Sequence, residues 1–120
     1  AIQHVMLDEV WKLLEAPGGA GAVENMARRF RKRRTALWLA TQQVGEFLDA
    51  PAGRRILSVV GNTILMEQRP VEAKRLQATF DLSDYMTDSL HRLGTGHGVL
   101  VTPEGNLRIW IAAPEGWGVY

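Results

Sequence analysis

Two short strand-like runs separated by helical segments constrain the fold of this chain more than any other feature. The first run covers residues 2–7 and the second covers residues 36–40. Between them, apolar residues recur at helical spacing over residues 9–15 and 22–34. Strands that alternate with helices predict an α/β fold with parallel strands. Because the run at 36–40 is uninterrupted, we expect that strand to be buried on both faces of the sheet.

The second half of the chain predicts further helices and a terminal hairpin. The expected elements are helices near 53–60, 71–80 and 83–93 and a strand at 63–68. Glycines at 94, 96 and 98 indicate a flexible junction. Antiparallel strands at 99–102 and 107–112 would follow, joined through a turn at 103–106. We therefore expect one α/β domain over residues 1–120, with a largely parallel sheet, a C-terminal antiparallel hairpin and flanking helices.

Composition narrows the possible chemistry. Cysteine is absent, which removes disulfides and thiol chemistry and fits a cytosolic chain. The three histidines lack metal-ligand spacing, and no stretch is apolar for the ~18 residues that a membrane span needs. The net charge of +1 argues neither for nor against nucleic acid. We expect the tryptophans to be packing residues, namely Trp11, Trp38, Trp110 and Trp117.

Acidic residues follow the first predicted strand directly, where ligands bind in parallel sheets. Asp8 and Glu9 after an apolar strand form the arrangement called Walker B. In that arrangement the Asp holds a magnesium ion through water, and the Glu orients or deprotonates the water that attacks the terminal phosphate. The alternative is a helix N-cap at Asp8 followed by a first-turn carboxylate.

A polar segment follows the second predicted strand at Thr41, Gln42 and Gln43. A neutral amide at Gln42 could hydrogen-bond both the attacking water and the terminal phosphate, which a carboxylate would repel. Alternatively, Gln42 satisfies backbone groups of its own loop.

A basic stretch forms the third candidate site. It comprises Arg28, Arg29, Arg31, Lys32, Arg33 and Arg34. Three interpretations compete: a solvated helix face, a nucleic-acid patch, or the source of an arginine finger that reaches a neighbouring subunit's nucleotide.

Together these residues resemble the VirB/Tra-type ATPases of type IV secretion and conjugative transfer. The similar blocks are Asp8-Glu9-Val10-Trp11-Lys12-Leu13-Leu14, Arg31-Lys32, Leu39-Ala40-Thr41-Gln42 and Ile64-Leu65-Met66-Glu67-Gln68. The resemblance covers nearly the whole chain. It implies a RecA-like P-loop NTPase domain, typically in a hexamer at the inner membrane, where ATP hydrolysis drives substrate transfer or pilus assembly.

The resemblance also implies roles for particular residues. Asp8 would be the magnesium-linked acid, Glu9 the catalytic carboxylate, Gln42 the phosphate sensor and Arg31 the arginine finger. The family continues Arg-Lys with an aromatic or small residue and then Gly, whereas this chain continues with two further arginines. The glycines at 94–98 resemble the family's Gly-rich passage into its last strands, where they serve backbone geometry, and Gln68 matches a family glutamine.

A phosphate-binding loop of the form G-x-x-x-x-G-K-[ST] occurs nowhere in the sequence. In the family that loop lies upstream of the Walker B strand. We therefore expect the chain to be the C-terminal part of a RecA-like domain, inactive alone, with no bound cofactor and an exposed surface that belongs in an interior. The parent protein would bind ATP and Mg²⁺, form a hexamer, and lie in the cytoplasm against the inner membrane, with secretion-channel components as partners and DNA as a further candidate partner.

Two alternatives stay open. A HerA/FtsK-like DNA-pumping ATPase would share Asp8, Glu9 and Gln42. A non-enzymatic interaction module would instead use the basic stretch to bind nucleic acid or acidic protein surfaces.

Overall fold

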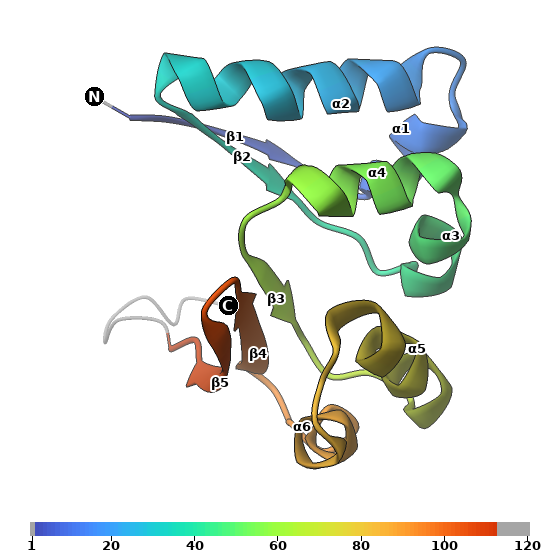
Figure 1. Ribbon diagram of the computed structural model, residues 1–120, viewed down its shortest axis with the longest axis vertical. Coiled ribbons are helices and arrows are strands. Elements are labelled where there is room, and N and C mark those ends of the chain that lie inside the picture. Colours follow the sequence, from blue (N-terminus) through green and yellow to red (C-terminus); the bar gives the residue numbers. More distant parts are fainter. Residues whose placement is uncertain (1, 113–120) are drawn as a thin grey trace, which may run out of the picture. The chain divides into compact units, whose positions relative to one another are not determined.

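The computed structural model describes residues 2–112 and divides into two compact units, Ala1–Val60 and Gly61–Tyr120 (Figure 1). The predicted packing role of Trp117 lies outside the described residues. Each unit has its own sheet. The first sheet has two strands, β1 and β2, and the second has three strands in the order β3-β4-β5.

The first unit is a parallel strand pair covered by helices. Its elements are β1 (Gln3–Leu7), α1 (Val10–Glu15), α2 (Gly19–Phe30), the 3₁₀ turn η1 (Arg31–Arg33), β2 (Thr35–Leu39), α3 (Val44–Asp49) and α4 (Pro51–Val59). Strands β1 and β2 pair in parallel, with Gln3 opposite Thr35 and Leu7 opposite Leu39. The prediction of parallel strands in this part of the chain is confirmed.

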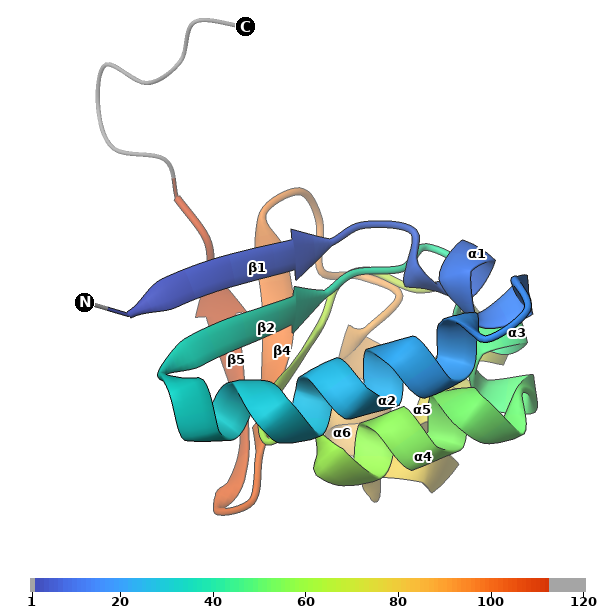
Figure 2. The ribbon, with the colours of Figure 1, turned by 90° about the horizontal axis from the view of Figure 1, so that it is seen from above.

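The core of the first unit lies between its helices. Helix α2 runs alongside α4 and also contacts β2 (Figure 2). The buried side chains are Val10 of α1, Val23 of α2, Phe47 and Leu48 of α3, and Ile56 of α4. Their alignment on facing sides follows from apolar residues at helical spacing, and their burial supplies the main stabilisation of the unit.

One face of the β1–β2 sheet carries exposed apolar side chains. Met6 and Trp38 are register partners and therefore share a face, yet their exposed fractions are 68% and 47%. Ile2, of the same parity, is also exposed. The expectation that the strand at 36–40 is buried on both faces is wrong for the described residues, because Trp38 on this face is exposed.

The second unit is built on an antiparallel sheet. Its elements are β3 (Thr63–Leu65), α5 (Pro70–Phe80), α6 (Asp84–Ser89), β4 (His97–Thr102) and β5 (Gly105–Trp110). Strand β3 pairs with β4, and β4 forms the predicted hairpin with β5 through a turn at Pro103 and Glu104. Buried apolar side chains of this unit include Leu65, Leu76, Leu82, Leu90 and Val99.

The prediction of a largely parallel sheet is correct only in part. Only β1 and β2 pair in parallel among the described residues, and the strand predicted at 63–68 pairs antiparallel with β4 in a separate sheet. This strand also ends early, at Leu65. Its apolar pattern was read correctly, but strand direction depends on the partner, which local periodicity does not specify.

Two helix boundaries differ from the predictions. The helix predicted at 22–34 begins at Gly19 and ends at Phe30, followed by η1 and then Arg34 in the left-handed region at φ 51°. Helix α3 was not predicted, because its six residues are too short for a clear helical period.

Candidate functional site

Hydrogen bonds connect both sides of the turn at Asp8 and Glu9 to the end of the neighbouring strand. The Ala40 N–H donates a hydrogen bond to the Leu7 carbonyl at 2.9 Å, and the Val10 N–H donates to the Ala40 carbonyl at 3.0 Å. These bonds extend the β1–β2 pairing past both strand ends. The structure therefore brings the acidic turn and the loop that begins at Thr41 to the same edge of the sheet, as predicted.

Glu9 adopts a backbone conformation that is uncommon for its residue type. It is the N-cap of α1, with φ 52° and ψ 44° in the left-handed region. A residue other than glycine held there costs about 1–3 kcal/mol, and such residues cluster at functional sites. Backbone hydrogen bonds hold the main chain in this geometry. The Val10 N–H donates to the Ala40 carbonyl, and the Lys12 N–H donates to the Glu9 carbonyl.

The alternative interpretation of Asp8 as a helix cap is wrong. The cap position belongs to Glu9, and no side chain caps α1 by a hydrogen bond. Asp8 Oδ1 accepts instead from the adjacent Glu9 N–H at 2.9 Å. Asp8 is exposed, so its carboxylate stands at the sheet edge rather than serving the helix.

The carboxylate of Glu9 is held by Trp11. The indole Nε1–H donates to Glu9 Oε2 at 2.6 Å, and both residues are partly buried. This distance is short even for a charge-assisted hydrogen bond. Sequence reasoning treated Trp11 as a packing residue and missed this contact. The only sequence signal is a ring N–H donor two positions after a carboxylate, which in a regular helix would not face it.

Gln42 lies exposed in the loop between β2 and α3. The loop is shaped by its neighbours, since the Gln43 N–H donates to Thr41 Oγ1 at 3.1 Å and Gln43 is the N-cap of α3. Among residues 2–112, the Gln42 amide makes no hydrogen bond to the protein. It is therefore not used to satisfy loop backbone groups, and both its donor and its acceptor are available to a ligand.

Arg31 does not join these residues. It is exposed in η1, which precedes β2 at its amino end, where the Gln3 N–H bonds the Arg34 carbonyl at 3.1 Å. Asp8, Glu9 and Gln42 follow the carboxyl ends, and five-residue strands separate the two edges by roughly 16 Å. The whole basic stretch is exposed, and within the described part of the chain none of its six cations forms an ion pair.

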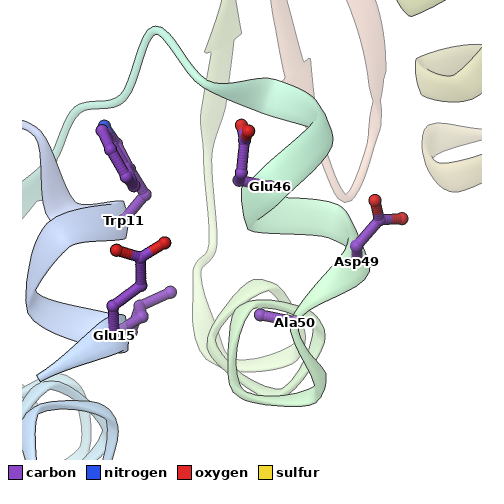
Figure 3. Close-up of a pocket in the computed structure, with 6 residues that line it drawn as sticks. Trp11, Glu15, Glu46, Asp49 and Ala50 are labelled. Carbon is purple, nitrogen blue, oxygen red and sulfur yellow. The ribbon is translucent and has the colours of Figure 1, made fainter.

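A pocket of about 290 Å³ lies between α1 and α3 beside this edge (Figure 3). Trp11 and Glu15 of α1 line it on one side, and Glu46 and Asp49 of α3 on the other, with Leu14 and Ala50 completing the wall. Three of its lining residues are acidic, but no group of three or more His, Cys, Asp or Glu residues in the described chain could hold a metal ion.

The structure of the chain is similar to VirB4 of Thermoanaerobacter pseudethanolicus. The TM-score is 0.82 and the sequence identity is 25%, and the match covers 95% of this chain and 32% of that chain. The resemblance to the VirB/Tra-type ATPases is confirmed. Neither a family model nor a curated protein matches the sequence.

Because the likeness to VirB4 covers 95% of the chain, it also extends over the second unit. There Glu67 Oε1 accepts from the Gly94 N–H at 2.9 Å, and Gln68 donates its N–H to the Leu90 carbonyl at 2.9 Å. Gly94 and Gly96 have φ values of 76° and 80°. These glycines therefore serve backbone geometry, as the resemblance implied.

The chain spans about a third of the length of the VirB4 chain it matches. Between residues 2 and 112, no helix has the length and apolar character needed to cross a lipid bilayer.

Proposed function

We propose that this chain is the C-terminal part of a RecA-like motor ATPase of type IV secretion or conjugation, which couples ATP hydrolysis to the transfer of DNA or protein. One observation carries the proposal: Leu7 and Val10, which flank the Asp8-Glu9 turn, are hydrogen-bonded to Ala40 at the strand tip that leads into Gln42, within a fold similar to VirB4. Ligands of parallel α/β sheets bind at this edge.

Each residue of this edge receives a role. Glu9 orients or deprotonates the water that attacks the terminal phosphate. Gln42, whose amide has no protein partner among the described residues, hydrogen-bonds that water and the phosphate. Their neighbouring positions suit reaction at one phosphate, where catalysis consists chiefly of positioning and charge stabilisation.

Asp8 suits a magnesium ion held through water. Its carboxylate is exposed, and among residues 2–112 it accepts a hydrogen bond only at Oδ1, from the Glu9 N–H. Mg²⁺ keeps most of its waters and needs only one or two carboxylates together with substrate phosphates, so a cluster of three protein ligands is not required. The ion would neutralise charge on the phosphate oxygens.

Arg31 acts on a neighbouring subunit in this proposal. It lies at the opposite edge of the sheet from Glu9 of its own chain, which suits a finger that reaches across a head-to-tail interface. The parent would accordingly form a ring, with a hexamer as the expected size. We place it in the cytoplasm at the inner membrane, with channel components as partners. Without a phosphate-binding loop, the chain alone binds no ATP tightly and has no activity.

The test is ATP hydrolysis by the complete protein, including its phosphate-binding loop. Glu9→Gln should abolish turnover while ATP binding persists, because the amide cannot accept the proton of the attacking water. Glu104→Gln in the β4–β5 turn is the matched control and should leave turnover unchanged. Wild-type protein that assembles but neither binds nor hydrolyses ATP would refute the motor function.

The basic stretch supports a second candidate, a non-enzymatic module that binds nucleic acid. Its six exposed cations have no ion-pair partner in the described chain, whereas Arg55 elsewhere in the unit pairs with Glu24 at 2.8 Å. If this function is correct, the chain alone binds DNA with an affinity that falls steeply with salt. Neutralising Arg28, Arg29, Arg33 and Arg34 together should then remove binding. Absence of salt-sensitive binding by the unaltered chain argues against the module.

A further inference from the structure

Trp11 bridges an anion and a cation at the start of α1. Its Nε1–H donates to Glu9 Oε2 at 2.6 Å, and Lys12 Nζ lies 5.8 Å from the ring centroid. An aromatic ring is electron-rich on its face and positive at its edge, so both contacts are electrostatically favourable. The indole is thus held in one orientation with its N–H directed at Glu9.

The contact between Glu9 and Trp11 depends on the left-handed backbone of Glu9. Residues two positions apart in a helix do not face each other. Because Glu9 has φ 52° and lies just outside the helix, its side chain is turned to meet the indole. The left-handed backbone conformation of Glu9 therefore makes its short hydrogen bond to Trp11 possible. The conformational cost at Glu9 accompanies the formation of that hydrogen bond.

The main chain alone does not fix the carboxylate of Glu9. Backbone hydrogen bonds from Val10 to Ala40 and from Lys12 to Glu9 hold the main chain. The glutamate side chain still has three rotatable bonds and loses substantial conformational entropy when it is ordered. A tryptophan has only two such bonds. An indole N–H therefore restrains one carboxylate oxygen with a comparatively rigid donor.

We propose that Trp11 is a positioning residue for Glu9, with its indole N–H holding Oε2 so that Oε1 is free to accept the proton of the attacking water. This inference rests on the proposed function of Glu9. Displacement of a reacting group by about 1 Å can cost on the order of 100-fold in rate. Trp11 also lines the pocket of about 290 Å³ (Figure 3).

Trp11→Phe in the complete protein tests this inference, because phenylalanine keeps an aromatic side chain but has no N–H donor. The expected result is a fall in kcat of about 10-fold to 100-fold, with KM for ATP changed by less than about twofold. Trp110→Phe is the control, since Trp110 is exposed on β5 and should leave kcat unchanged. Trp11→His, which retains a ring N–H, should keep more of kcat than Trp11→Phe.

A double-mutant cycle separates positioning from a merely structural role. On the Glu9→Gln background, Trp11→Phe should lower the residual single-turnover rate no further, because the group it orients is already gone. Three results would overturn the inference. The first is a further loss of the same factor when Trp11→Phe is added to Glu9→Gln, and the second is a wild-type kcat for Trp11→Phe. The third is a kcat of Trp11→His no higher than that of Trp11→Phe. Retained turnover in Glu9→Gln itself would instead overturn the proposed function of Glu9, so the two failures are distinguishable.

Discussion

At the residue scale, a few side chains at the two ends of one parallel strand pair carry the functional argument. Glu9 and Asp8 follow β1, and Arg31 precedes β2. The separation of these ends is fixed by strand length, so one chain cannot bring Arg31 to its own Glu9. This geometry favours an arrangement in which Arg31 contributes its charge to the nucleotide site of a neighbouring subunit.

The first prediction concerns which arginine acts as the finger. In the complete protein, Arg31→Ala should lower kcat by about 10³-fold or more, because the charge that stabilises the transferring phosphate is lost. ATP binding, measured separately, should persist. Arg33→Ala is the matched control, since it removes an equally exposed charge from the same turn. A larger loss of kcat in Arg33→Ala than in Arg31→Ala would show that Arg31 is not the arginine finger.

At the element scale, two glycines set how the helices of the first unit meet. A Cβ built on Gly19 of α2 would lie 1.7 Å from the Leu13 carbonyl oxygen, and one on Gly53 of α4 would lie 1.9 Å from the Phe47 carbonyl oxygen. In both cases a helix starts against the backbone of the short helix before it. The pairs α1–α2 and α3–α4 are therefore built by the same close contact.

The second prediction follows from this contact. Gly53→Ala should destabilise the chain by about 1–3 kcal/mol, because the methyl group cannot fit against backbone atoms without a shift of the helices. Gly21→Ala in α2 is the control. A Cβ there meets nothing within 4 Å, so stability should stay unchanged or rise by up to about 1 kcal/mol from improved helix propensity. Urea unfolding followed by circular dichroism measures both, and equal effects would contradict the packing argument.

At the scale of the whole molecule, one face of the β1–β2 sheet is exposed although it carries apolar side chains. Parallel sheets are ordinarily covered on both faces, yet Met6, Trp38 and Ile2 are exposed here. The chain also covers only 32% of the VirB4 chain that it resembles. An apolar surface of this kind favours association with another apolar surface.

The third prediction is that the isolated chain self-associates through this face. Sedimentation velocity should show association that increases with concentration, and Met6→Glu should weaken it by placing a charge within the apolar face. Tyr85→Glu is the matched control, because Tyr85 is also 68% exposed but lies on helix α6. Comparable weakening by both variants, or a monomeric chain at all concentrations, would refute this prediction.

The sequence by itself determined the features that depend on local pattern. Apolar periodicity located β1, β2, the helices α1, α2 and α5 and the β4–β5 hairpin within a few residues. The polar residues after each strand tip identified Asp8, Glu9 and Gln42, because the carboxyl ends of parallel strands share an edge. These features follow from the spacing of residues along the chain, so no partner is needed to predict them.

Only the tertiary structure decided the features that depend on contacts between distant segments. The antiparallel direction of β3 is set by its pairing with β4. The left-handed conformation of Glu9 and its bond to Trp11 occur beside the hydrogen bond from Val10 to Ala40. Such contacts have no periodicity in the sequence, and their free energies exceed the small local preferences that they override. Long-range hydrogen bonds and packing therefore determined how the residues of the candidate site are held.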